Sequence, residues 1–273
     1  MTQSRLVTAN TRTFSAPFPI VVEAVKKAGF TGLEVWNDDI TRLSGGVGEA
    51  RTLLAEAKLG ISAFQLLRDF EGGRASRTVR LEQAERLMST MAEIGSDMLL
   101  VCSNGDSASS SDPADHVADL RALAELAAAR HMRIGFEPLA WSPWIYDYET
   151  AWACVDRVDH PSLGITLDMF HLFARSTPLE VLERIPIEKY FGVQLCNAVP
   201  MPLPAIQIAR HHRLFPSEGT WPVADVVRRL DARGYAGSYS VEVFNDDYRE
   251  RDPVEIAARA WGSYQELFAR ETR

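Results

Sequence analysis

Gly164-Ile165-Thr166-Leu167-Asp168-Met169-Phe170-His171 is a short apolar run that ends in a carboxylate and is followed, three residues later, by an imidazole. Its length and composition are typical of a strand that is buried on both faces. A buried strand has no reason to carry a bare carboxylate unless another group neutralises the charge. The stretch therefore predicts a strand whose end, at Asp168, belongs to a functional site.

Three other apolar runs carry an oxygen donor at or near their ends: Arg133-Ile134-Gly135-Phe136-Glu137, Phe191-Gly192-Val193-Gln194-Leu195 and Tyr239-Ser240-Val241-Glu242-Val243. Together with Asp168 they supply three carboxylates and one amide. Such an all-oxygen set suits Mg²⁺, Mn²⁺ or a similar divalent ion such as Co²⁺ better than a metal that prefers thiolates. We predict one divalent metal ion, although each donor taken alone could be a helix cap or a salt-bridge partner. The predicted ligands are Glu137, Asp168, Gln194 and Glu242.

The whole chain alternates between short apolar runs and segments with helical periodicity. Strands are expected at residues 6–9, 33–36, 61–66, 98–102, 133–136, 165–168, 191–194 and 239–244. Helices are expected at residues 18–28, 47–57, 78–94, 113–129, 148–158, 179–184, 223–233 and 253–268, with a long loop at 197–222.

Eight strand-helix units in 273 residues are the count and length of a (β/α)8 TIM barrel, an α/β fold. We expect one domain over residues 1–273. A doubly wound open sheet is the alternative, but no glycine-rich fingerprint follows the first strand. In a barrel the functional site lies at the carboxyl ends of the strands, so the four donors, on consecutive strands, are expected to meet there.

Composition limits the class of protein. The net charge of −8 and the pI of about 5.3 argue against a nucleic-acid groove or an anionic membrane surface as partner. We see no signal peptide and no apolar run long enough to span a bilayer. Three scattered cysteines indicate buried thiols in a reducing compartment, and neither a disulfide framework nor a zinc site. A cytoplasmic globular protein is expected.

The segments around the four donors resemble those of the xylose-isomerase-like sugar isomerase and epimerase superfamily: Phe136-Glu137-Pro138-Leu139-Ala140-Trp141, Leu167-Asp168-Met169-Phe170-His171, Val193-Gln194-Leu195-Cys196-Asn197 and Ser240-Val241-Glu242-Val243-Phe244-Asn245. The loops at residues 64–72 and 210–216 are similar to those of its bacterial 3-dehydroshikimate dehydratase branch. The resemblance covers nearly the whole chain. It implies a (β/α)8 barrel with one divalent metal on the four predicted ligands.

The resemblance further implies a lyase that converts 3-dehydroshikimate to protocatechuate by enolisation and loss of water, as in quinate and shikimate degradation. A metal acts as a Lewis acid on the substrate oxygens, and a histidine can move both protons because its pKa lies near working pH. Some superfamily members carry a histidine two residues after the first glutamate, where this chain has Leu139. His171 is therefore the expected acid/base, with Glu137 and Glu242 as further catalytic residues.

The expected substrate is a small cyclic hydroxy-keto acid, whose carboxylate calls for a guanidinium. Arg68 and Arg210 are the candidates, although a salt bridge, for Arg68 with Asp69, is the alternative. Gln65 and His211 are also assigned to the substrate, while adjacent His211 and His212 are expected to point in different directions. Glu34 could line the site or form an ion pair in the barrel. The residues Trp141, Trp144 and Tyr146 could form a lid or pack against another subunit.

Two other classes of function remain open. A ketose isomerase or epimerase, or an inosose dehydratase, would share the metal and the barrel, with Glu137 and Glu242 acting on either side of a carbon atom. A non-catalytic metal- or sugar-binding barrel is the second. An abasic-site endonuclease would need a basic surface and a histidine-rich metal cluster, and this chain has six histidines and a negative net charge. Oligomeric state, including a homo-oligomer, the metal used and the preferred enolisable substrate are left open.

Overall fold

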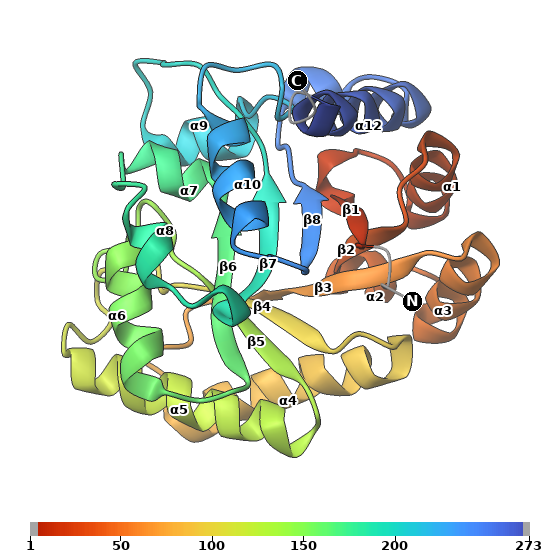
Figure 1. Cartoon of the computed structure of the whole chain (residues 1–273). Coiled ribbons are helices and arrows are strands. Elements are labelled where there is room, and N and C mark those ends of the chain that lie inside the picture. The colour runs from red at the N-terminus through yellow and green to blue at the C-terminus, as the bar shows by residue number, and fades with distance from the viewer. Residues whose placement is uncertain (1–4, 270–273) are drawn as a thin grey trace.

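The structure, a computed structural model, describes residues 5–269. Eight parallel strands pair with their neighbours in sequence, and β1 pairs with β8 to close a barrel (Figure 1). The predicted (β/α)8 fold is confirmed. The strands are β1 Val7–Asn10, β2 Gly32–Trp36, β3 Gly60–Leu67, β4 Met98–Cys102, β5 Arg133–Glu137, β6 Leu163–Asp168, β7 Tyr190–Leu195 and β8 Ser238–Val241.

Helices surround the barrel, and α12 lies beside α1 where the ring of helices closes (Figure 1). The ring of Trp261 meets that of Phe30 edge-on, with centroids 5.1 Å apart, at this junction. Within residues 5–269, no helix combines the length and apolarity that crossing a membrane requires. The larger helices are α1 Phe18–Ala28, α3 Gly46–Ala57, α4 Arg77–Ile94, α5 Pro113–Ala129, α6 Tyr148–Val158, α10 Val223–Ala232 and α12 Pro253–Ala269.

Short helices lie mostly in the loops that follow the carboxyl ends of the strands. They are η1 Thr11–Thr13, α2 Asn37–Thr41, α7 Met169–Ala174, α8 Val181–Arg184, η2 Ile187–Lys189, α9 Ala205–His211 and α11 Asp246–Arg249. The expected loop at 197–222 thus contains a helix, α9, which follows Pro204 and is too short to show a periodic apolar face in the sequence. Strand β8 ends three residues earlier than expected, yet the Glu242 backbone N–H still donates to the Leu195 carbonyl at 3.1 Å.

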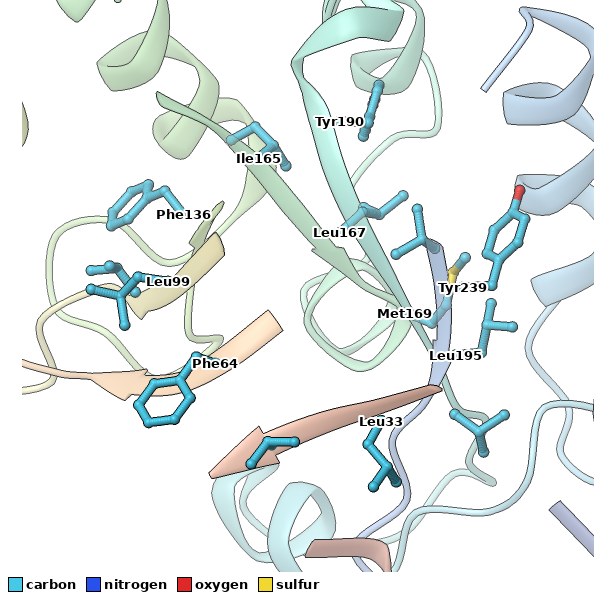
Figure 2. Close-up of a cluster of buried hydrophobic side chains, with 14 of the residues drawn as sticks. Leu33, Phe64, Leu99, Phe136, Ile165, Leu167, Met169, Tyr190, Leu195 and Tyr239 are labelled. Atoms are coloured by element: carbon cyan, nitrogen blue, oxygen red, sulfur yellow. The ribbon is translucent and has the colours of Figure 1, made fainter. Parts of the chain in front are cut away.

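The apolar core lies between the strands and the helices. Buried side chains from the strands, such as Leu33, Phe64, Leu99 and Phe136, belong to one continuous cluster with apolar residues of the helices (Figure 2). Successive side chains of a strand point to opposite faces. Because Phe136 faces this core, the next residue, Glu137, is directed to the inside of the barrel at its carboxyl end.

The inside of the barrel is filled by polar side chains and by Met98, which lies against Gly135 and Gly192. A Cβ atom on Gly135 would lie 2.3 Å from Thr166 Oγ1, so only glycine fits at this position. One layer contains a buried hydroxyl pair, Thr8 Oγ1 and Ser62 Oγ, 3.0 Å apart. This filling leaves the functional side chains to project from the carboxyl end, as expected for the fold.

Candidate active site

The four predicted donors come together with His171 at the carboxyl end of the barrel, and all five side chains are buried. His171 Nε2 lies 3.4 Å from Glu137 Oε1 and 3.6 Å from Asp168 Oδ2. One ligand atom from each of these three residues lies within 4.8 Å of the others. Gln194 pairs with Asp168 across β6 and β7, and its Nε2 lies 3.0 Å from Glu242 Oε1.

Local structure fixes the positions of Asp168 and His171. Asp168 ends β6 and caps α7, because its Oδ1 accepts the Phe170 backbone N–H at 2.7 Å. The Asp168 backbone N–H donates to Tyr148 Oη at 2.6 Å, which ties the strand end to α6. Residues three apart on a helix lie on the same side, so α7 returns His171 to the Asp168 carboxylate.

Hydrogen bonding determines which nitrogen of His171 carries the proton. The Ala140 backbone N–H donates to Nδ1 at 2.9 Å, so Nδ1 must have a free lone pair. Burial lowers the pKa of His171 to about 4. At neutral pH the ring is therefore uncharged and presents an Nε2–H group toward Glu137 and Asp168.

Arg213 lies inside the centre and was not among the sequence-predicted site residues. Its Nη1 donates to Asp168 Oδ2 at 2.8 Å and to Glu242 Oε2 at 3.0 Å. The guanidinium is held between the rings of Phe170 and Phe244, each 4.9 Å away. Although burial opposes ionisation, Arg213 keeps the pKa of Asp168 below its usual value. The sequence signal that could have found Arg213 was its place in the loop at 210–216.

One arginine does not balance the charge of this centre. The centre contains four buried acids: Glu34, Glu137, Asp168 and Glu242. Within residues 5–269 the cation paired with them is Arg213, because His171, which also lies near two of them, is neutral. Burial, followed by repulsion from Asp168 and Glu242, raises the pKa of Glu137 well above its usual value. Burial likewise raises the pKa of Glu242. A divalent cation is the natural counter-charge for such a site.

Gln194 provides an independent test of whether the site fits a metal ion. Its Nε2 donates to both carboxylate oxygens of Glu34, at 3.2 and 3.3 Å, and to Glu242. Its Oε1 is buried and has no hydrogen-bond partner. Buried polar atoms are rarely left unpaired, because desolvation without a partner costs free energy. The oxygen donors and this unpaired oxygen together fit a hard divalent metal ion.

A cavity of about 450 Å³ opens above this centre. Arg68 and Arg210 line it, and their guanidinium carbons lie 5.9 Å from the Trp36 ring and 6.0 Å from the Trp141 ring, respectively. Among the described residues, neither arginine has a carboxylate within salt-bridge distance. Asp69 instead accepts the Gly105 backbone N–H at 3.1 Å. Two unpaired cations therefore face the space where a substrate would lie.

The other sequence-predicted residues divide between the cavity and its surroundings. Gln65 and Trp141 line the cavity, and Gln65 Nε2 donates to Glu242 Oε1 at 3.4 Å. His211 does not line it, and its Nδ1 lies 2.9 Å from Asp246 Oδ2. The residues that line the cavity also do not include three further candidates, His212, Trp144 and Tyr146.

A second hollow, of about 680 Å³, lies beside the barrel rim. Its lining includes Arg12, Phe14 and Arg249 but a single carboxylate, Asp39, and none of the four donors. Asp39 accepts hydrogen bonds from Thr11 and from the Trp36 backbone N–H, so it is already engaged. The smaller cavity above the donors is therefore the candidate active site.

Several known proteins are similar to this chain. A 3-dehydroshikimate dehydratase of Pseudomonas aeruginosa is 40% identical over 240 residues, which are 88% of this chain and 38% of that protein. A solved xylose isomerase-like TIM barrel/4-hydroxyphenylpyruvate dioxygenase fusion protein superposes with a TM-score of 0.93 at 35% identity, over 97% of this chain and 43% of the fusion protein. The solved IolI protein with a bound zinc atom gives 0.87 at 17% identity, over 97% and 98% of the two chains.

The first two relatives are much longer than this chain, which spans about two fifths of their length. The likeness to the IolI protein, at its low identity, shows the fold alone. The model of the xylose isomerase-like TIM barrel family matches residues 22–264, which include all four donors, His171 and Arg213. The chain therefore belongs to the xylose isomerase-like TIM barrel family.

Proposed function

We propose that this chain is a metal-dependent hydro-lyase that converts 3-dehydroshikimate to protocatechuate by enolisation and loss of water. The observation that carries the proposal is the pairing, in one cavity, of an acidic buried centre with two arginines that have no carboxylate partner. An acid that is also a polyhydroxy ketone would use both features. The similarity to the dehydratase of Pseudomonas aeruginosa supports the same substrate.

We infer that Glu137, Asp168, Gln194 and Glu242 hold the divalent ion. When bound, the ion polarises the substrate carbonyl and stabilises the negative charge that develops on its oxygen. Arg213 stays with Asp168 and Glu242 and offsets part of their negative charge. The all-oxygen donors favour Mg²⁺, Mn²⁺ or Co²⁺, although the IolI neighbour was solved with zinc.

Arg68 and Arg210 are proposed to bind the substrate carboxylate. A guanidinium forms two parallel hydrogen bonds with a carboxylate, which fixes orientation as well as affinity. The ring of Trp36 lies against Arg68 and that of Trp141 against Arg210, so each cation is oriented before the substrate arrives. Gln65, on the wall of the same cavity, is positioned to hydrogen-bond a substrate hydroxyl.

The two proton transfers are assigned to different residues. Because His171 carries its proton on Nε2, it is suited to donate and not to accept at that atom. Glu137 therefore takes the proton from the carbon next to the carbonyl. As the bond from carbon to the leaving hydroxyl breaks, that hydroxyl takes the Nε2 proton and leaves as water, while the proton on Glu137 moves to Nε2, 3.4 Å away. The two transfers occur together, so the ring stays neutral and both residues end in their initial states.

The direct test is a spectrophotometric assay of the purified, metal-loaded protein with 3-dehydroshikimate, following protocatechuate absorbance with and without EDTA. We expect product that EDTA suppresses and that added Mn²⁺ restores. Ketoses and inososes are tested in parallel, since the isomerase and inosose dehydratase alternatives share the centre. Turnover of a neutral polyol with none of the acid would overturn the proposal. Cytoplasmic location stays a prediction, and the sequence leaves the oligomeric state open.

A further inference from the structure

Glu34 lies beneath the proposed metal centre and accepts hydrogen bonds without a cation beside it. It is buried on β2, and neither carboxylate oxygen has a cationic partner within residues 5–269. The expected alternative of a barrel ion pair is therefore wrong. Instead Glu34 Oε2 accepts from Ser240 Oγ at 2.9 Å and from Asn10 Nδ2 at 3.2 Å, and both oxygens lie near Gln194 Nε2.

The surroundings of Gln194 leave its amide one orientation. The groups next to its Nε2 are the carboxylates of Glu34 and Glu242, which accept and do not donate when ionised. Turning the amide over would place Oε1 against these oxygens and lose all of these hydrogen bonds. The NH₂ group therefore faces Glu34 and Glu242, and the unpaired Oε1 remains on the other side of the amide.

Asn10 completes the framework around Glu34. Its Nδ2 donates to Glu34 and, at 2.7 Å, to Glu242 Oε1. Its Oδ1 accepts from Trp36 Nε1 at 3.0 Å and from the Arg12 backbone N–H at 2.8 Å, so this amide cannot turn over either. In this network of described side chains, Gln194 Oε1 is the oxygen that has no hydrogen-bond partner.

We propose that Glu34 is a positioning residue that holds the Gln194 amide with its oxygen toward the metal ion. The inference rests on the metal ion of the proposed function and adds a reason for a carboxylate at position 34. A glutamine there would keep one oxygen for the hydrogen bonds that the two oxygens of Glu34 now accept from Asn10, Gln194 and Ser240. The Gln194 NH₂ group would then be held chiefly by Glu242, so its oxygen would face the metal less often.

The test measures Mn²⁺ dissociation constants by electron paramagnetic resonance for the wild type, Glu34→Gln, Gln194→Glu and the double variant. We expect each single variant to weaken binding about 10- to 100-fold, as the loss of groups that orient ligands commonly does. In Gln194→Glu the new carboxylate faces the carboxylates of Glu34 and Glu242 without a donor between them. In the double variant the new NH₂ group at position 34 donates to the carboxylate at position 194, whose other oxygen faces the metal. Glu242 still opposes that carboxylate, so the double variant should recover part of the affinity that Gln194→Glu loses.

The double variant separates positioning from charge. If Glu34 acted through its charge alone, Gln194→Glu would bind Mn²⁺ more tightly than the wild type and the two effects would add. Glu34→Asp keeps the charge but withdraws the carboxylate by one methylene, and it is expected to weaken binding as well. Ser62→Ala removes a polar atom from a deeper layer of the barrel and serves as the matched control, with unchanged affinity.

Wild-type affinity in Glu34→Gln or Glu34→Asp, or additive effects in the double variant, would overturn the inference while leaving the proposed function intact. Absence of Mn²⁺ binding by the wild type would overturn both. Metal binding with the expected pattern but without turnover of 3-dehydroshikimate would sustain the positioning role and refute the proposed substrate. Circular dichroism of each variant checks that it is folded.

Discussion

Within residues 5–269, buried acids at the helix layer and at the carboxyl end of the barrel differ in how their charge is balanced. On the outside, Asp119 of α5 accepts from Arg77 Nε and Arg80 Nη1, each at 2.5 Å, and from the Gly72 backbone N–H. Although burial opposes it, these donors lower the pKa of Asp119. At the barrel end, Asp168 and Glu242 share Arg213, and within residues 5–269 Glu34 and Glu137 have no arginine partner. A buried carboxylate alone therefore does not mark a functional site, whereas an excess of them over cations does.

The largest expected effect is on activity and concerns the acids at the barrel end, which outnumber the cations beside them. Glu137→Ala and Glu242→Ala should lower kcat/KM at least about 1,000-fold, because each removes a metal ligand and a catalytic carboxylate. Both variants should still fold, because each one removes a buried negative charge that no cation fully balances. Activity and Mn²⁺ affinity, measured beside thermal unfolding, check this. Full activity in either variant would contradict the metal assignment.

Removing Asp119, whose charge is balanced by arginines, should lower stability instead of activity. Asp119→Ala leaves the buried guanidinium of Arg80 without its partner and is expected to cost about 3–5 kcal/mol of unfolding free energy. The matched control is Asp97→Ala, which breaks an exposed pair with Arg133 and should cost at most about 1 kcal/mol. Urea unfolding measures both. Equal losses in the two variants would show that the Asp119 cluster is not a structural element.

The substrate arginines should give a smaller, selective effect. Arg68→Ala and Arg210→Ala are each expected to raise KM for 3-dehydroshikimate about 10- to 100-fold, because a charge-assisted hydrogen-bonded pair is lost. Neither arginine has a carboxylate partner to leave unpaired, so unfolding free energies should stay near the wild-type value. Steady-state kinetics tests this, and an unchanged KM in both variants would remove them from the carboxylate site.

The smallest effect per step of the measurement is a pH dependence of stability from Glu71, which lies near Asp119. Burial raises the pKa of Glu71 to about 8. Between its unfolded pKa and pH 8 the side chain is protonated when folded and ionised when unfolded, so unfolding releases a proton. Stability should therefore fall as pH rises, by about 1 kcal/mol per pH unit between pH 5 and 8. Glu71→Gln should lack this contribution, and identical pH profiles for the two proteins would refute it.

The fold and the positions of the four donors were predictable because both depend on local pattern. Each strand appears in the sequence as a short apolar run, and a barrel brings the ends of consecutive strands together wherever the runs occur. Glu137 and Asp168 could thus be placed at strand ends from the sequence alone. The same reasoning gave the helix from Tyr148 to Val158, whose limits the structure reproduces.

The contacts that balance charge were not predictable in the same way. Arg213 reaches Asp168 because the chain around α9 returns over the barrel, and no sequence period encodes that return. In the sequence, Asp119 looks like a solvent-facing acid of an amphipathic helix. Only the structure shows that Arg80 lies beside it. The orientation of Gln194 depends on Glu34, 160 residues away, and the tautomer of His171 depends on a single backbone N–H.

The excess of carboxylates over cations can be tested by the protons that metal binding displaces. Mn²⁺ is titrated calorimetrically into metal-free protein at pH 7, in buffers that differ in their enthalpy of ionisation. Because the pKa values of Glu137 and Glu242 are raised, the account predicts release of about one proton or more for each ion bound, with one ion per chain. A binding enthalpy independent of the buffer, or no binding at all, would contradict it.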